Sequence, residues 1–306
     1  MERGNPMLDQ EKLAILKNKK GFITALDQSR GSTPKALKAY GIPMSSYQTE
    51  EEMFYWVHQL RIRILESPAF DSEKIIASIL YEDTVKREVA GLFTADFLWQ
   101  KKGIIPFLKI DRGLDVEDKG VQKLNPITDL PDLLQLAKDY HIFGTKARSV
   151  IRRADEEGIR ELVKQQFDLA KDVLAADLLP IIEAEVDIRS TEKGEAEILL
   201  KQAIKEQLAL LDDDQYVMLE LTLPKEDNFY ADLAQDKHVV RIVALSGIYG
   251  REEATRNLAK NRDMIASFSR ALLEGLSYEQ SEEAFNSVLG TAIDAIYQAS
   301  VSKDGN

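Results

Sequence analysis

Charged or hydroxyl side chains recur at the ends of short apolar runs throughout this sequence. Asp27 follows FITAL, Lys109 closes PFLK and Glu183 closes PIIE; the same placement is shared by Asp111, Lys146, Arg148, Glu185, Glu220, Ser246 and Arg270. Cations and carboxylates that are brought together shift one another's pKa values and can supply both an acid and a base near neutral pH. The pattern predicts an acid–base site that acts on an anionic substrate.

Other residue types give no sign of a metal or thiol centre. The three histidines, at 58, 141 and 238, lack the spacing of metal ligands, and the chain contains no cysteine. A cluster of carboxylates alone would favour glycoside hydrolysis or a divalent metal, but here four lysines and arginines stand among five carboxylates. We therefore expect no metal and no other cofactor.

Two short segments have the features of a phosphate site. Leu245-Ser246-Gly247 follows the seventh apolar run, and Ser269-Arg270 follows the eighth. Many eight-stranded barrels hold phosphate at these two places through loop amides and a helix N-terminus. The first segment alone could be an ordinary loop, but its pairing with Arg270 in the right chain order favours phosphate binding.

The elements that would position these residues are short strands that alternate with amphipathic helices. About eight strand candidates occur, at 21–27, 75–81, 104–110, 141–146, 178–183, 216–222, 239–246 and 264–269. Such nearly continuous apolar runs are typical of parallel strands that are covered on both faces. Because no flexible linker divides the chain, we predict one α/β domain over 1–306, a (β/α)8 TIM barrel, whose active site lies at the C-terminal ends of its strands.

Helix boundaries can be predicted at several places. An N-terminal helix is expected at about 8–19 and a C-terminal helix at about 278–301. Thr49 begins the capping-box sequence T-E-E-E, and Ser277 begins a similar S-Y-E-Q sequence that we interpret as the start of the C-terminal helix.

Net charge limits the classes of partner. The formal net charge of −12 disfavours nucleic acids and anionic membranes, which bind mainly through lysine and arginine. No stretch approaches the roughly 20 apolar residues that cross a bilayer, and the N-terminus lacks the apolar core of a secretory signal, so a cytoplasmic protein is expected. A small anionic metabolite remains compatible with this charge, because distant surface charges are screened over about 10 Å.

Several segments resemble, in the same order, the motifs of bacterial class I fructose-bisphosphate aldolases. They are GFITALDQSRGSTPKALKAYGI, FLKIDRGL, HIFGTKARS, LPIIEAEV, VMLELTLP, VALSG and IASFSRAL. The resemblance covers nearly the whole chain. It implies a (β/α)8 barrel that reversibly cleaves fructose 1,6-bisphosphate to dihydroxyacetone phosphate and glyceraldehyde 3-phosphate, in glycolysis and gluconeogenesis. It also implies a sugar phosphate as the small-molecule partner, and it allows a homo-oligomer.

The resemblance assigns roles to individual residues. Asp27 matches an aspartate of the carbon–carbon bond chemistry, Lys146 a lysine that assists formation and dehydration of the carbinolamine, and Glu183 the acid/base of Schiff-base formation, with Glu185 in support. The residues that the resemblance places on the substrate and its phosphates are Ser29, Lys35, Lys109, Arg148, Ser246, Gly247, Ser269 and Arg270.

The chain departs from the family pattern at the Schiff-base lysine itself. The family motif would read MLKLT, whereas residues 218–222 read MLELT, with Glu220 at the lysine position. A carboxylate has no nitrogen that could condense with a ketone. We expect Glu220 to lie among Lys35, Lys109 and Lys146 and to pair with one of them.

The replacement of the Schiff-base lysine by Glu220 leaves two alternatives to an ordinary active aldolase. The protein is a catalytically silent homologue or inactivated variant that binds sugar phosphates, or Lys146 serves as a relocated nucleophile. Nearby carboxylates would raise the pKa of Lys146, which is the wrong direction for a nucleophilic amine. A metal-dependent class II-like lyase is disfavoured because no histidine pair has ligand spacing.

Smaller departures lie beside the predicted site. Arg30 and Ile248 stand where relatives often have glycine. Ile248 would disturb the phosphate loop if that position required a positive φ, which isoleucine resists.

Overall fold

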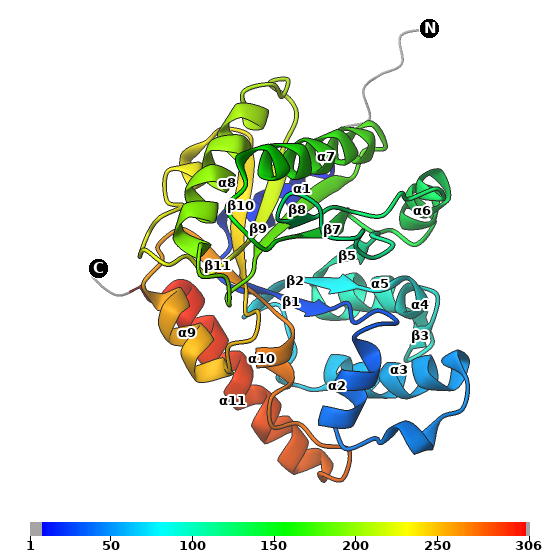
Figure 1. Ribbon diagram of the computed structural model, residues 1–306. Helices are drawn as coiled ribbons and strands as arrows, with labels where there is room; N and C mark the ends of the chain where they lie inside the picture. The colour runs from blue at the N-terminus through cyan, green and yellow to red at the C-terminus, as the bar shows by residue number, and fades with distance from the viewer. Residues whose placement is uncertain (1–7, 304–306) are drawn as a thin grey trace, which may run out of the picture.

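The computed structural model describes residues 8–303 and forms a closed barrel of parallel strands surrounded by helices (Figure 1). The predicted (β/α)8 fold is therefore confirmed. The eight barrel strands are β1 (Phe22–Leu26), β2 (Ile75–Leu80), β5 (Ile105–Lys109), β7 (Gly144–Ile151), β8 (Leu179–Val186), β9 (Val217–Thr222), β10 (Val239–Leu245) and β11 (Met264–Phe268). They pair in the order β5-β2-β1-β11-β10-β9-β8-β7, and the ring closes where β5 pairs with β7.

Three further strands lie outside this ring. The strands β3 (Glu88–Val89) and β4 (Leu92–Phe93) form a small antiparallel pair. Strand β6 (Val121–Gln122) pairs antiparallel with the end of β7, and so lengthens the sheet beside the barrel mouth.

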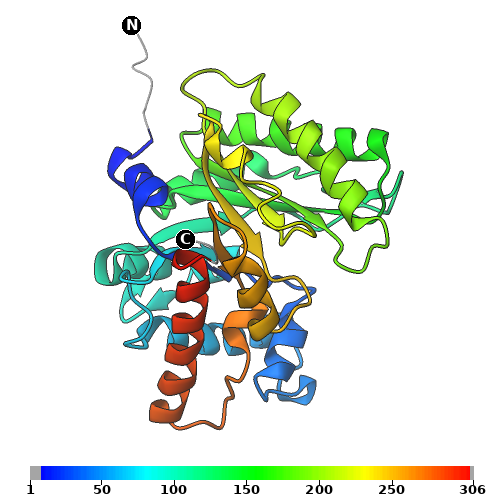
Figure 2. The ribbon, with the colours of Figure 1, turned by 90° about the vertical axis from the view of Figure 1, so that its left-hand side faces the viewer.

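Helices cover the outer face of the barrel and the end at which its strands begin. They are α1 (Gln10–Asn18), α2 (Thr33–Ala39), α3 (Glu50–Glu66), α4 (Glu82–Val85), α5 (Thr94–Phe97), α6 (Leu130–Asp139), α7 (Glu156–Ala175), α8 (Lys193–Leu208), α9 (Arg251–Ala259), α10 (Arg270–Leu273) and α11 (Glu282–Val301). Short helical turns are η1 (Met44–Ser46), η2 (Leu98–Lys102) and η3 (Leu233–Gln235). Helices α9 and α11 pack side by side (Figure 2). Within residues 8–303, no helix has the length and apolar character needed to span a membrane.

The barrel interior changes from apolar to polar along the strands. A buried cluster inside the barrel includes Ala25, Phe107, Ile181, Met218 and Ile265. Leu13 and Leu16 of α1 close this cluster at the end where the strands begin. Alternate residues of a strand share a face, so the residue two positions further along each strand also points inward. These residues are Asp27, Lys109, Glu183, Glu220 and Ser267. The strand period thus places a polar layer directly above the apolar core.

Two strands, β7 and β8, differ by several residues from their predicted ranges. His141 is not in a strand, because it has a positive φ of 56° in the turn that precedes β7. Strand β7 instead extends to Ile151 and β8 to Val186, because the two strands remain paired along their length and Ile151 is the partner of Val186. Lys146 and Glu183 therefore lie within strands, where pairing on both sides fixes their positions.

The helix termini show one confirmed capping box and one wrong prediction. Thr49 and Glu52 form the predicted box at the start of α3. Helix α11 begins only at Glu282 and is capped by Ser281, whereas Ser277 and Gln280 hydrogen-bond to each other within a separate turn. The S-Y-E-Q pattern was thus satisfied locally without starting a helix. The ends of the predicted domain, residues 1–7 and 304–306, lie outside the described residues.

Candidate active site

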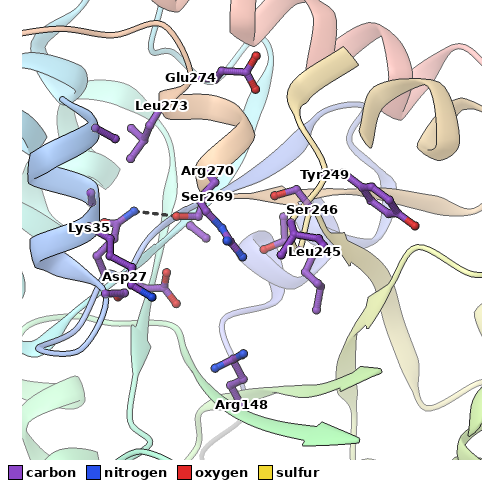
Figure 3. A pocket seen from close by; sticks show the side chains of 18 of the residues that line it. Asp27, Lys35, Arg148, Leu245, Ser246, Tyr249, Ser269, Arg270, Leu273 and Glu274 are labelled. Atoms are coloured by element: carbon purple, nitrogen blue, oxygen red, sulfur yellow. Dashed lines mark hydrogen bonds between the residues drawn. The ribbon is translucent and has the colours of Figure 1, made fainter. Parts of the chain in front are cut away.

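A cavity of about 720 Å³ opens at the C-terminal ends of the barrel strands (Figure 3). Its lining includes every residue that the sequence suggested for the site except Ser29 and Asp111: Asp27, Lys35, Lys109, Lys146, Arg148, Glu183, Glu185, Glu220, Ser246, Gly247, Ser269 and Arg270. Ser29 lies in the turn before α2, where its carbonyl accepts hydrogen bonds from the backbone N–H and the hydroxyl of Thr33.

The floor of the cavity is organised around Lys146. Its ammonium lies 2.5 Å from Asp27 Oδ2 and 2.7 Å from Glu183 Oε2, and its side chain is only 4% exposed. Strands β1, β7 and β8 supply these three residues, so one cation connects strands from different sides of the barrel. A buried charge of this kind is tolerated only when it is well paired.

Mutual attraction fixes the charge states of this group. Burial alone would raise the pKa of Asp27, but Lys146 and Lys109 outweigh it and hold that pKa at about 2. Burial alone would lower the pKa of Lys146, but Asp27, Glu183 and Glu220 together raise it well above its usual range. Lys146 is therefore a firmly protonated ammonium.

Glu220 lies on the same floor in a different state. It is 1% exposed and stands beside Glu183 in the β8–β9 register. Burial raises its pKa to about 8, against the lowering effect of Lys146 and with further increases from Glu183 and Asp27. Its carboxyl group is thus mostly protonated at neutral pH.

The predicted surroundings of Glu220 are only partly correct. Among the described residues Glu220 forms no ion pair, because Lys146 is held by Asp27 and Glu183 instead. Lys109 pairs with Asp111 at 3.0 Å. Of the three lysines expected to surround Glu220, Lys146 is the one among the main causes of its pKa shift.

Two more cation–carboxylate pairs occupy the walls. Besides the Lys109–Asp111 pair, Arg148 Nε donates to Glu185 Oε2 at 2.6 Å, and the backbone N–H of Arg148 donates to Asp111 at 3.3 Å. Burial alone would lower the pKa of Arg148. The nearby carboxylates of Glu185 and Glu183 raise this pKa by more than burial lowers it, so the net shift is upward. These pairs leave the walls close to neutral.

The mouth, by contrast, carries cations without partners. Lys35 on α2 and Arg270 on α10 are exposed and line the cavity. In the part of the chain that the structure describes, neither side chain makes a hydrogen bond or an ion pair. Figure 3 shows Arg270 extending into the cavity from the side opposite Arg148. The mouth therefore has a net positive charge even though the protein as a whole is acidic.

The loop after β10 requires glycine at position 247. Gly247 has a φ of 55°, and a Cβ atom there would lie 2.2 Å from Ile188 Cδ1. Ile248 does not have a positive φ. The concern that isoleucine would disturb this loop was wrong, because the left-handed conformation falls on the glycine before it.

Sequence reasoning missed two residues that hold the site together. Gln28 donates from Nε2 to the Ser269 hydroxyl at 2.7 Å (dashed in Figure 3), and so ties β1 to the loop after β11. Arg61, 1% exposed, donates to both the carbonyl and Oε1 of Gln28, at 3.0 and 3.2 Å. One signal was available: Arg61 lies four residues after Val57 and three before Ile64, within the apolar stripe of α3.

The arrangement can exchange protons and bind an anion. It has a buried acid–base group at its floor and unpaired cations at its mouth. Both lysines of its polar layer are held by carboxylates, because Lys146 pairs with Asp27 and Glu183 and Lys109 pairs with Asp111. Among residues 8–303, no three histidine or carboxylate side chains are arranged to hold a metal ion.

Comparison with known proteins supports the same architecture. The structure resembles fructose-bisphosphate aldolase from Plasmodium falciparum, solved in complex with TRAP and a small-molecule inhibitor, with a TM-score of 0.71 and 20% identity over 98% of each chain. It also resembles Cgl0159 from Corynebacterium glutamicum, with a TM-score of 0.55 and 13% identity over 95% of this chain and 90% of that one. The sequence matches no protein-family model. At these identities the likeness shows the fold, and this chain has the (β/α)8 fold of an aldolase structure.

Proposed function

We propose that this protein is a class I fructose-bisphosphate aldolase of the bacterial type in its architecture, and that it binds a sugar phosphate without forming a Schiff base. The observation that carries the proposal is the combination of unpaired cations at the mouth with Glu220 at the floor. The mouth can hold a phosphorylated ligand, whereas the floor offers no nucleophilic nitrogen to its carbonyl carbon.

Phosphate binding is supported by groups of two kinds. Lys35 and Arg270 offer charges that no carboxylate neutralises, and the loop at Gly247 brings backbone close to the same cavity. Charge-assisted hydrogen bonds to phosphate oxygens are stronger than neutral ones, and arginine can donate two in parallel. A phosphorylated ketose of three to six carbons is the ligand that the sequence resemblance favours.

Lys146 is not the substitute nucleophile in this proposal. An amine must be neutral to attack a carbonyl, and Lys146 is held as an ammonium by two carboxylates at 2.5 and 2.7 Å. Replacing either carboxylate would weaken this hold, but the wild-type chain retains both. We therefore infer that aldol cleavage of fructose 1,6-bisphosphate is silent in this chain.

Borohydride trapping tests the missing nucleophile. The wild-type protein is incubated with dihydroxyacetone phosphate and borohydride, and adducts are located by peptide mass spectrometry. We expect no adduct in the wild-type chain, and an adduct at position 220 together with cleavage activity in Glu220→Lys. A wild-type adduct on Lys146 would overturn the proposal. An inert Glu220→Lys variant that still binds ligand would show that the pocket differs from an aldolase site.

Ligand titration tests the mouth. Phosphorus NMR or calorimetry measures binding of dihydroxyacetone phosphate to wild-type protein, Lys35→Ala and Arg270→Ala. We expect each substitution to weaken binding about tenfold, which corresponds to roughly 1.4 kcal/mol. Lys38→Ala is the matched control, since Lys38 is also exposed on α2 but does not line the cavity. An equal loss in Lys38→Ala would indicate a general charge effect and contradict the site.

We also propose a cytoplasmic location and a role among sugar phosphates of central metabolism. The absence of cysteine is compatible with a reducing compartment, and the acidic surface disfavours nucleic acid as a partner. Fractionation of cells that express the protein would test the location.

A further inference from the structure

Three buried side-chain oxygens of the cavity lining have no hydrogen-bond partner within residues 8–303, namely Glu183 Oε2, Glu220 Oε2 and Ser267 Oγ. Glu220 Oε2 is buried and forms no hydrogen bond with any residue from 8 to 303, although its side chain lines the cavity. A buried polar atom without a partner is uncommon in folded proteins, and it often marks a place that a ligand or a reaction uses. The other floor carboxylates differ from Glu220, because Asp27 and Glu183 both hold Lys146.

The groups that face Glu220 come from every neighbouring part of the floor. They are Lys146 from β7, Glu183 from β8, Asp27 from β1 and the hydroxyl of Ser267 from β11. On the remaining side β10 places the apolar Val243 next to it in the register. A carboxyl group with a free oxygen thus stands close to one ammonium, at the end of a cavity whose mouth carries unpaired cations.

We propose that Glu220 removes a proton from the carbon next to the carbonyl group of a bound phosphorylated hydroxyketone, while the Lys146 ammonium stabilises the carbonyl oxygen. The site would then move protons on its ligand without any covalent intermediate. This inference rests on the proposed function, because it requires a sugar phosphate to be bound at the mouth.

The step balances without any further reagent. The C–H bond of the hydroxymethyl carbon breaks, its electron pair forms the C=C bond of an enediolate, and the carbonyl π electrons move onto the oxygen that faces Lys146. Glu220 carries the proton. The proton returns to the same carbon, which regenerates the ketone, or it is delivered to the former carbonyl carbon after the neighbouring hydroxyl proton has moved to the other oxygen. The second route converts a ketose to an aldose, and neither route needs an oxidant.

The environment makes Glu220 a stronger base than an ordinary glutamate. Burial raises its pKa to about 8, with Lys146 opposing and Glu183 and Asp27 adding to the effect. The more basic carboxylate accepts a carbon-bound proton more readily, once it is itself deprotonated. Proton removal should therefore increase as the pH rises toward 8 and level off above it.

Deuterium exchange measures this step directly. Dihydroxyacetone phosphate is incubated with the protein in D₂O between pH 6 and 10, and proton NMR follows the loss of the hydroxymethyl C–H signal. We expect exchange well above the buffer rate, rising about tenfold per pH unit and reaching a plateau above pH 8. Glu220→Gln should lower the rate about 100-fold or more, the low end of the contribution of a positioned general base. Glu51→Gln, an exposed glutamate on α3, should leave it unchanged.

The outcomes separate this inference from the proposed function. If dihydroxyacetone phosphate binds, by phosphorus NMR, but exchanges no faster than in buffer, the inference fails and ligand binding stands. If Glu220→Gln exchanges as fast as wild type, another base is responsible and the inference also fails. If the ligand does not bind, both fail. Glu220→Asp covers the case in which the glutamine variant does not fold: it should retain the pH rise with a lower plateau, and a flat profile would overturn the inference.

Discussion

Replacing Glu220 by glutamine removes a group whose pKa in the folded protein, about 8, lies far above the 4.5 of an unperturbed glutamate. A difference of about 3.5 pH units corresponds to about 4 to 5 kcal/mol, at roughly 1.4 kcal/mol per unit. Solvent screening does not reduce this value much, because Glu220 is 1% exposed. The carboxyl group should therefore control a large part of the pH dependence of stability.

The direction of the effect follows from where the proton is bound. Below pH 4.5 both the folded and the unfolded chain hold it, and the contribution to stability is complete. Between pH 4.5 and 8 the unfolded chain releases the proton while the folded chain keeps it, so the free energy of unfolding falls as the pH rises. Above pH 8 both states have lost it and the loss is constant. Glutamine does not titrate, so the free energy of unfolding of Glu220→Gln relative to wild type should increase across this range.

Urea denaturation followed by circular dichroism measures the effect. Wild type, Glu220→Gln and the surface control Glu51→Gln are unfolded at pH 5 and at pH 8.5. The decisive quantity is how much the stability difference between Glu220→Gln and wild type changes between the two pH values, because effects of the amide that do not depend on pH then cancel. Asp27, with a pKa of about 2, titrates below this range. An unchanged difference would mean that Glu220 is ionised in the fold, and it would refute the account of its environment.

Three further substitutions test separate features. Gly247→Ala should cost about 1–2 kcal/mol of stability and weaken phosphate binding, because of its φ of 55°, whereas Gly250→Ala, whose φ is not positive, should have little effect; equal losses would contradict the loop argument. Arg61→Met should cost about 3 kcal/mol in urea denaturation, since it leaves the buried Oε1 of Gln28 without a donor and leaves the Gln28 carbonyl with the Thr33 hydroxyl alone, and a change below about 0.5 kcal/mol would show that these hydrogen bonds contribute little. Thr49→Ala should lose about 1 kcal/mol with the capping box of α3, and thermal unfolding that matches wild type would disprove that contribution.

Much of the fold could be predicted because the strands are nearly continuous apolar runs. That pattern requires cover on both faces, and the chain can provide it only by alternating strands with helices. The ends of helices and strands were harder to predict, because the same local sequence can form its hydrogen bonds either in a helix or in a turn. Ser277 and Gln280 complete each other's turn without starting a helix, and His141 adopts the left-handed conformation that a β-propensity argument would exclude.

The residues that line the site could be predicted better than the ion pairs that they form with one another. Strand position and inward direction follow from the period of two along each strand, and this brought Asp27, Lys146 and Glu183 to one cavity. Which cation meets which carboxylate depends on side-chain reach in three dimensions, so the expected partners of Glu220 were mostly wrong. Arg61 was missed because it acts through Gln28 from a helix that itself contributes little to the cavity.

The polar floor and the cationic mouth belong to parts of the chain with different freedom to change. Lys146, Glu183 and Glu220 lie in strands that are paired on both sides, so moving any of them would shift the register of the whole ring. Lys35 and Arg270 lie on short helices that connect the strands, where insertions and replacements are tolerated. A variant with new connecting segments could thus accept a different anion while the same proton-handling group operates beneath it.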